Sequence, residues 1–375
     1  MSNDFYLIAG WRPIYTNRSD TLSNLAFDKL KKRVNVEPSV KVYETKNYHI
    51  HGIQPIANNQ GSYWMTTQDQ ANSIFYADGA IKESNENCVG TDNTLFSGLM
   101  VGKYKVLFFD KYEADIMDQD KLVCRLPFKL WSYRSHCGVY YCRHPFITKG
   151  KMYVIANDKQ LFRCNIQAIN DILSKDRKHK QELEPSLDFK DHIVLVDNNI
   201  IDCCADAITG NIYYLTDKGS VMSGAKRVFY IEKTSLDLNE TCPVAIAAIG
   251  RSIVVATIIK PETVSQSHLR LQLFNAKGKP TDELSTASPS THEFISQMKA
   301  FELRRCRLLV SSRVLGYCDI HAIHNGKLHL VNDKMQVYKL THYSIWDLLV
   351  EVDKSRADII FVGFEIFNRI TINIK

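Results

Sequence analysis

The sequence contains no Cys-x-x-Cys pair, although it has ten cysteines in 375 residues. Several of them lie inside apolar runs, such as Cys124 in LVCRL, Cys142 in YYCRH and Cys164 in LFRCNI. A cysteine in that setting packs as a small buried hydrophobe, whereas secreted disulfide frameworks are short and loop-rich. The cysteines therefore predict free thiols in a reducing compartment, the cytoplasm or the nucleus.

Long apolar runs are also absent. No run is long enough to cross a bilayer, and the start MSNDFYLIAGW lacks the basic residues, the sustained apolar stretch and the cleavage site of a signal peptide. We expect no membrane partner and no export.

Enzyme signatures are missing as well. The sequence has no G-x-S-x-G elbow, no phosphate-binding P-loop, no H-E-x-x-H pair and no dinucleotide-binding fingerprint. It therefore predicts a protein that is not an enzyme, with no catalytic residue, no cofactor-binding residue and no cofactor.

Charge of one sign is not strongly in excess. Lys and Arg exceed Asp and Glu by 47 to 41, so the net charge is +6. The concentrated positive stretches are Lys29 to Arg33, Lys175 to Lys180, and a candidate basic patch of Arg304, Arg305 and Arg307. Because such stretches are usually solvated faces, nucleic acid is a less favoured partner than protein.

What the chain does contain is a repeat. A turn glycine, a small or basic residue and a hydrophobic strand with aromatic residues recur along the chain. The copies begin at Gly61, Gly102, Gly150, Gly210, Gly250 and Gly326. Glycine supplies the positive φ that a tight hairpin needs. Two copies continue into a polar turn and a second strand, with Asn157-Asp158 and Asn332-Asp333 predicted at the turns.

A short hydrophobic strand, often rich in small residues, precedes these glycines. Such strands are predicted near Ile53, Leu99, Phe146, Ile201, Val244, Met298 and Trp346, about 45 to 55 residues apart, which fits the four-stranded blade of a propeller. The sequence thus predicts an all-β, closed β-propeller of about seven four-stranded blades, within a range of six to eight.

The whole chain, residues 1–375, is predicted to be one such domain. Its ring would close by pairing an N-terminal strand, DFYLIAG, with the C-terminal segment IIFVGFEIFNRITINIK. Few short helices are expected: residues 22–33 have an amphipathic pattern, and residues 170–183 suit a loop or a surface helix. Residues 280–292 are predicted to be a flexible loop.

On these repeats the chain resembles the broad class of β-propellers, WD-repeat-like proteins included, without their Gly-His and Trp-Asp hallmarks. One local segment, Trp131-Ser-Tyr-Arg134, resembles the W-D-x-R motif with which some WD-repeat proteins dock onto the cullin-adaptor propeller, with Ser132 replacing the aspartate. We place it in the connection between the third and fourth blades. Trp131, Tyr133 and Arg134 are the candidate partner-binding residues, because Trp, Tyr and Arg dominate interface hot spots.

The histidines predict no metal site. His136, Cys137, Cys142 and His144 are close in sequence, but on an extended strand six residues span roughly 20 Å. Asp202 and Asp206, at or near an inner strand, could hold a channel metal, although a carboxylate there more often accepts backbone hydrogen bonds.

The function predicted is a non-enzymatic scaffold or adaptor that binds a peptide or a partner domain on one face of the ring. Two alternatives stay open at this point. One is a metal-dependent hydrolase or lactonase that uses Asp202 and Asp206. The other is an RNA-associated propeller that uses the Arg304 to Arg307 cluster and the Lys175 to Lys180 stretch.

Overall fold

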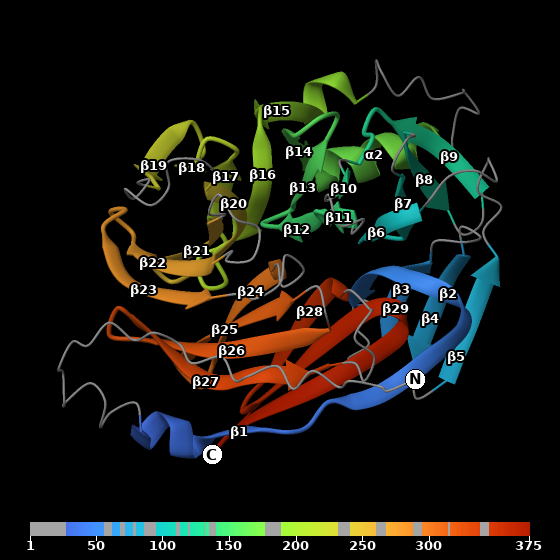
Figure 1. Cartoon of the computed structure of the whole chain (residues 1–375). Helices are drawn as coiled ribbons and strands as arrows, with labels where there is room; N and C mark the ends of the chain where they lie inside the picture. The colour runs from blue at the N-terminus through green and yellow to red at the C-terminus, as the bar shows by residue number, and fades with distance from the viewer. Residues whose placement is uncertain are drawn as a thin grey trace, which may run out of the picture.

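The protein is described from a computed structural model. It describes residues 28–55, 62–67, 72–77, 80–85, 95–109, 113–118, 121–130, 132–134, 140–176, 189–231, 241–259, 268–287, 295–313, 316–337 and 345–375. Strands dominate this part of the chain, and the sheets follow one another around a ring (Figure 1). The prediction of an all-β propeller is confirmed.

Five of the sheets are antiparallel meanders of four consecutive strands. The first holds β6 (Leu95–Val101), β7 (Tyr104–Phe109), β8 (Ala114–Asp118) and β9 (Lys121–Leu126). The second holds β12 (Phe146–Thr148), β13 (Lys151–Ala156), β14 (Gln160–Asn165) and β15 (Ile193–Asp197). The third holds β16 (Ile200–Ala205), β17 (Ile212–Thr216), β18 (Ser220–Ser223) and β19 (Lys226–Tyr230). The fourth holds β20 (Thr241–Ile249), β21 (Ser252–Ile259), β22 (His268–Asn275) and β23 (Pro280–Ala287). The fifth holds β24 (Ile295–Leu303), β25 (Cys306–Arg313), β26 (Tyr317–His324) and β27 (Lys327–Gln336).

A sixth, seven-stranded sheet joins strands from both ends of the described chain. It comprises β1 (Val34–Val36), β2 (Val40–Pro55), β3 (Tyr63–Thr67), β4 (Asn72–Ala77), β5 (Ala80–Asn85), β28 (Ile345–Asp353) and β29 (Arg356–Ile374). The second half of β29 folds back along its first half, since the Ile374 N–H donates to the Ser355 carbonyl. β1 and the first part of β2 then pair with that second half.

Six sheets of the described chain have four or more strands, which lies within the expected range of six to eight blades. The seven-stranded sheet, however, contains two groups of four strand segments. One group is β28, the two halves of β29 and the β1–β2 edge, and the other is the end of β2 with β3, β4 and β5. The seven residues predicted to mark inner strands each lie on the strand that comes first in the sequence of a four-stranded sheet, or on β2 or β28 of the seven-stranded sheet. These strands are β2, β6, β12, β16, β20, β24 and β28.

The hydrophobic core is distributed between neighbouring strand groups. One cluster joins the sheet of β6 to that of β12 and includes Phe108 and Met152, and another joins Ile53 of β2 to Ile360 of β29. Each fully buried side chain of this size stabilises the fold by about 1.5–3 kcal/mol. A ring of such interfaces replaces the single central core that a chain of this length could not fill.

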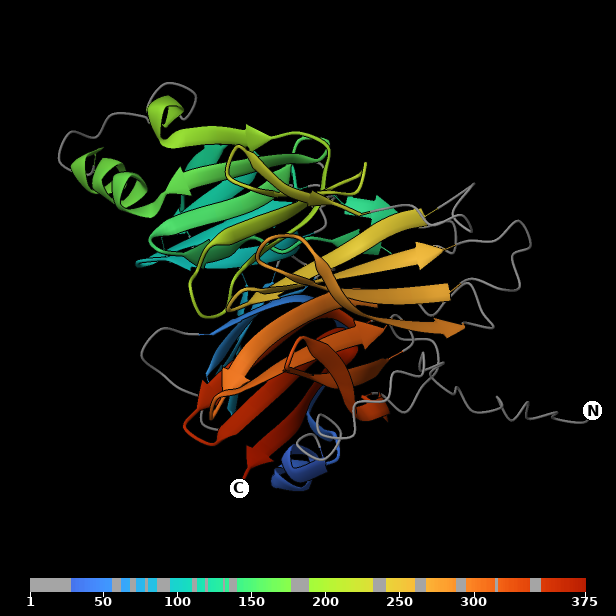
Figure 2. The same cartoon turned by 90° about the vertical axis from the view of Figure 1, so that its left-hand side faces the viewer.

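Helices are few in the described residues. Residues 28–33, α2 (Ile166–Asp176) and the 3-10 helix η1 (Lys190–His192) are helical, which confirms short helices in the two places where they were expected. α2 lies at one edge of the ring and buries Ile169 and Leu173 against the sheet beside it (Figure 2). No described helix is long and apolar enough to span a membrane.

Turn glycines of the repeat adopt the expected conformation, with φ of 70° at Gly150 and 72° at Gly326. Asn157 and Asp158 also form a turn, at φ of 47° and 64°. Two other predictions are wrong. Asn332 lies inside β27 beside a register shift instead of at a turn, and the chain from Pro280 to Ala287 is strand β23.

In the described part of the chain, β29 pairs with a segment that follows the predicted N-terminal strand in the sequence. The pairs run from Val34 to His49, with a register shift between Glu44 and His49. The segment DFYLIAG lies outside the described residues, so its predicted pairing stays a prediction.

Candidate functional site

Six of the seven inner strands carry a register shift at the same place, where one extra residue bulges out of the ladder. The shifts follow Ile50, Leu95, Ile200, Pro243, Ile295 and Ile345. The residue after each bulge is small or polar and is buried. We call these residues the axial belt: Gly52, Ser97, Asp202, Ala245, Gln297 and Asp347.

Asp202 and Asp347 make the same pair of contacts in two parts of the ring. Each carboxylate accepts the N–H of the next residue on its own strand, Cys203 at 2.9 Å and Leu348 at 2.7 Å. The other oxygen of each accepts an N–H from the neighbouring inner strand, Ile246 at 2.9 Å and Ile53 at 3.0 Å. These carboxylates therefore tie adjacent blades together.

Arg143, in the connection before β12, extends this network across the axis. Its guanidinium lies 3.3 Å from Asp202 and donates to the carbonyls of Ile201 and Val244, which are the bulged residues of β16 and β20. A bulge leaves its extra residue out of the strand ladder, so Arg143 supplies donors that the ladder does not. Burial raises the pKa of Asp202, and the Arg143 charge and two backbone N–H donors oppose that rise.

His144 makes the corresponding contacts on the other side. Its Nδ1 lies 3.0 Å from Ser97 Oγ and 3.7 Å from an oxygen of Asp347. Arg143 and His144 together make polar contacts with four inner strands, β16, β20, β6 and β28. This arrangement can hold inner strands in register.

Asp206 accepts backbone hydrogen bonds too. Its carboxylate takes the N–H groups of Ile208 at 2.9 Å and Thr209 at 2.8 Å, which closes the turn between β16 and β17. Burial acts to raise the pKa of Asp206, but the N–H donors of Thr209, Gly250 and Ile208 outweigh it and lower the pKa. Within the described ranges, no three His, Cys, Asp or Glu side chains come together as metal ligands.

Cys203 and Cys204 follow Asp202 on β16. Burial raises the pKa of both thiols, and the nearby Asp202 charge raises it further. Both thiols are therefore protonated at neutral pH and are weak nucleophiles.

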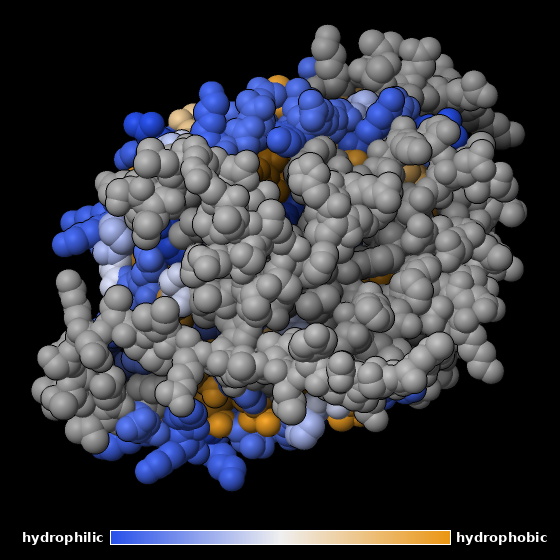
Figure 3. Space-filling view, in the orientation of Figure 1, coloured by the Kyte–Doolittle hydropathy of each residue, from blue (hydrophilic) through white to orange (hydrophobic). Residues whose placement is uncertain are grey.

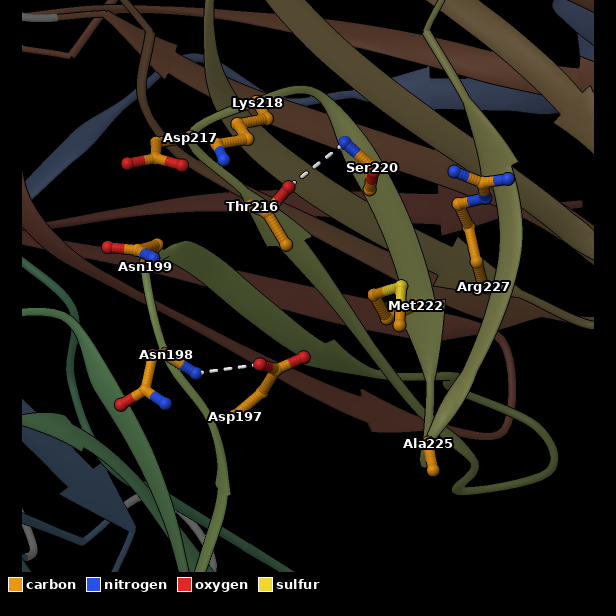
Figure 4. A pocket seen from close by; sticks show the side chains of 10 residues that line it. All are labelled: Asp197, Asn198, Asn199, Thr216, Asp217, Lys218, Ser220, Met222, Ala225 and Arg227. Carbon is orange, nitrogen blue, oxygen red and sulfur yellow. Dashed lines mark hydrogen bonds between the residues drawn. The ribbon is translucent and has the colours of Figure 1, made fainter.

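A groove of about 470 Å³ lies at the rim, between the sheet that ends in β15 and the sheet that ends in β19 (Figure 4). Its walls come from the end of β15, the β17–β18 turn and the β18–β19 hairpin. They are formed by Asp197, Asn198, Asn199, Thr216, Asp217, Lys218, Ser220, Met222, Ala225 and Arg227. The sequence analysis missed this groove, because its walls come from the end of one sheet and from two hairpins of the next sheet, and none of these segments carries a motif.

Internal hydrogen bonds fix the shape of the groove. The Ser220 N–H donates to Thr216 Oγ1 at 3.0 Å, and the Asn198 N–H donates to Asp197 Oδ1 at 2.8 Å. Asp217 lies 3.9 Å from the Lys159 ammonium. The side chains of Lys218 and Arg227 have no hydrogen bond or ion pair to other described residues, and both residues are exposed. The groove is thus preformed and presents two free cations.

Two of the three predicted partner-binding residues, Tyr133 and Arg134, fall in a short hairpin. β10 (Ser132–Arg134) pairs with β11 (Tyr140–Cys142), so the segment is a separate two-stranded ribbon between the sheet of β6 and the sheet of β12. It therefore lies between the second inner strand, β6, and the third, β12, one step earlier than the predicted connection between the third and fourth blades. Trp131 and the side chains of Tyr133 and Arg134 lie outside the described part of the structure.

The predicted basic patch lies at a hairpin turn. Arg304 and Arg305 form the two-residue turn between β24 and β25, with φ of 47° and 66°, and both are exposed. Arg307 follows on β25, 3.9 Å from Glu302. Of the Lys175 to Lys180 stretch, only the first two residues are described, at the end of α2.

Comparison with solved structures places this architecture among the β-propellers. A WD40-repeat structure of RRP9 matches with a TM-score of 0.52 at 10% identity, covering 92% of this chain and 98% of that one. YCF48 bound to D1 peptide matches with a TM-score of 0.50 at 9% identity, covering 91% and 95%. A complex of S. cerevisiae Dbp5 with Nup159, Gle1, IP6 and ADP matches with a TM-score of 0.54 at 7% identity, again covering 91% and 95%.

The chain is therefore a β-propeller whose neighbours in structure include WD40 proteins. At these identities the likeness concerns the fold alone. No family model matches the sequence, and no curated protein matches it.

Proposed function

We propose that this propeller is a protein-interaction scaffold that binds an extended peptide segment of a partner in the rim groove. The observation that carries the proposal is the preformed groove between β15 and the β18–β19 hairpin. β15 and β19 are the terminal strands of their sheets, and a terminal strand offers unpaired backbone groups to an added segment.

The side chains around the groove suit such a ligand. Lys218 and Arg227 offer charge to acidic residues of the peptide. Val194 and Leu195, on β15, are 40% and 47% exposed, so the same edge strand also offers apolar contact area. A peptide that is acidic at one end and apolar at the other fits both features.

The described surface elsewhere on the face seen in Figure 3 is largely hydrophilic, with hydrophobic residues in small separate areas. Peptide-bound propellers such as YCF48 with D1 peptide have the same fold, which supports a ring of this kind as a peptide platform.

The test is charge reversal in the groove. We expect Lys218→Glu with Arg227→Glu to abolish recovery of the main co-purifying partner in affinity purification followed by mass spectrometry. Neither side chain has a described partner to lose, so the melting temperature should stay near that of the parent. The matched control is Lys277→Glu with Lys279→Glu, two exposed residues at the β22–β23 turn. Equal recovery with the groove variant and the parent would contradict the proposal.

We propose the β10–β11 ribbon, with Trp131 directly before it in the sequence, as the second contact for a protein partner. Truncation of an interface anchor costs about 2 kcal/mol or more of affinity. We expect Tyr133→Ala with Arg134→Ala to weaken the same partner at least tenfold in a titration without lowering the melting temperature. A variant that binds normally, or that unfolds, would give this ribbon a structural role.

A further inference from the structure

The hairpin turns that join each inner strand to the second strand carry cations in most blades. Six of these turns are described, and five contain Lys or Arg. The five are Gly102-Lys103, Lys149-Gly150, Gly250-Arg251, Arg304-Arg305 and Lys354-Ser355. Inner strands of a propeller run in the same direction, so these turns all emerge on one face of the ring. The cations are exposed there.

Contacts between neighbouring turns make part of this face continuous. The Arg307 guanidinium reaches the β20–β21 turn, where a Cβ on Gly250 would lie 3.1 Å from Arg307 Nη2. Arg251 is the other residue of that turn. Cations from the fourth and fifth four-stranded sheets therefore adjoin.

The N-terminal helix adds to the same area. Arg33 donates through Nε to the Lys375 carbonyl at 3.0 Å, and the Lys375 N–H donates to the Arg33 carbonyl. The charge of Arg33 acts on Cys306, the residue after the Arg304-Arg305 turn, where it opposes the rise in pKa that burial causes. Two positive stretches about 270 residues apart in the chain therefore lie side by side. We call Arg33, Arg251, Arg304, Arg305 and Arg307 the arginine strip.

Little of this charge is neutralised within the described residues. Arg251, Arg304 and Arg305 have neither an ion pair nor a hydrogen bond from their side chains there. Two exposed carboxylates border the strip. Glu302 is 3.9 Å from Arg307, and Asp353 precedes Lys354. The net charge of the strip stays strongly positive.

We propose that the arginine strip binds the phosphodiester backbone of a nucleic acid. Arginine presents a planar fork of donors that pairs with phosphate oxygens in a bidentate way. A backbone that repeats one charge per nucleotide can engage several such forks along a strip. The strip and its turns contain no aromatic residue, so recognition rests on phosphates instead of base stacking and is independent of base sequence.

An acidic protein partner fits this surface less well. Protein interfaces need an apolar centre inside a polar rim. Among the exposed large hydrophobic residues that the structure describes, only Ile208, at the β16–β17 turn, and Val352, near the end of β28, lie beside the strip. This face is distinct from the rim groove, so the two proposals can fail independently.

The test measures binding of a fluorescent oligouridine by anisotropy as a function of salt. If the five arginines each neutralise one phosphate, the slope of log K against log salt is about −3.5, and Arg304→Gln with Arg305→Gln reduces it to about −2. We expect that variant to bind at least tenfold more weakly at low salt, with an unchanged melting temperature. An oligoadenine of equal length should bind the parent with the same slope.

The control is Lys277→Gln with Lys279→Gln, which removes the same charge from a turn that adds nothing to the strip. It should lower affinity far less than the arginine pair. Equal losses in the two variants would mean that net charge alone attracts the oligonucleotide, and would overturn the proposal. No binding to the oligonucleotide, with binding to an acidic peptide or to phosphatidylserine vesicles instead, would overturn it too. In either case the Lys218→Glu with Arg227→Glu variant would still test whether a peptide binds in the rim groove.

Discussion

The Arg143 guanidinium lies 3.3 Å from the Asp202 carboxylate at the axis of the ring, and only 10% and 11% of the two side chains are exposed. The pair joins a connection that precedes one sheet to the inner strand of the next. A buried pair of this kind need not add much net stability, but breaking it leaves a charge without its partner.

The first prediction follows from that pair. Arg143→Met should lower the free energy of unfolding by about 3–5 kcal/mol, because it leaves the Asp202 carboxylate and the carbonyls of Ile201 and Val244 without their donor. Chemical denaturation of the variant and the parent measures it. Arg143→Met with Asp202→Asn should recover part of the loss, and a double variant worse than the sum of the singles would contradict this coupling.

The same variant has a predicted dependence on pH. Arg143 opposes the rise in the pKa of Asp202, so its removal raises that pKa further above the unfolded value. A carboxyl whose folded pKa is raised loses stability as pH rises from the unfolded pKa through the folded one. The loss in the free energy of unfolding caused by Arg143→Met should therefore be smaller at about pH 4 than at about pH 7. A deficit that is constant with pH would mean that lost packing, not charge, causes it.

A third prediction concerns the close approach of Gly98 to Trp64. A Cβ at Gly98 would lie 2.1 Å from the Trp64 ring, whose side chain is fully buried. Gly98→Ala should destabilise the protein by about 1–3 kcal/mol, the usual cost of overpacking. Trp64→Phe makes room, so adding Gly98→Ala to Trp64→Phe should cost less than it costs in the parent. Thermal unfolding of the parent, the two single variants and the double variant measures both costs.

The fourth prediction concerns the sheet that holds both chain ends. A chain that begins at residue 46 loses β1 and every residue of β2 that pairs with β29 except His49, so most of the second half of β29 becomes an open edge. We expect a lower melting temperature and aggregation relative to a chain that begins at residue 28. Equal behaviour of the two chains would show that this pairing contributes nothing to stability.

The fifth prediction concerns thiol reactivity. Burial raises the pKa of Cys164 to about 12, whereas at Cys306 the nearby Arg33 opposes the rise. Maleimide labelling at neutral pH, followed by peptide mass spectrometry, should therefore modify Cys306 well before Cys164, because the thiolate is the reactive form. Arg33→Gln should slow labelling of Cys306 only. Faster labelling of Cys164 would contradict its burial.

Local signals in the sequence predicted the elements that local physics controls. The glycine-led hairpins and the inner strands depend on residues a few positions apart. The residues predicted to mark inner strands all lie on strands, and the turn glycines after Gly61, which lies outside the described residues, adopt the predicted positive φ. Identical local signals also gave opposite outcomes. The Asn-Asp pair at 157–158 is a turn, whereas the pair at 332–333 lies in β27, because β26 offers β27 a partner along most of its length. Strand pairing outweighed turn propensity there.

The sequence by itself determined the propeller architecture, its blade spacing and the burial of thiols such as Cys124 and Cys164, because alternation and turn chemistry are read over short distances. Only the tertiary structure decided that β29 folds back to pair with β1 and β2, that Arg143 meets Asp202, and that Arg33 joins Arg304 and Arg305. These relationships link residues from tens to hundreds of positions apart. The geometry of the ring brings them together, and that geometry depends on how blades pack against one another and not on any single segment.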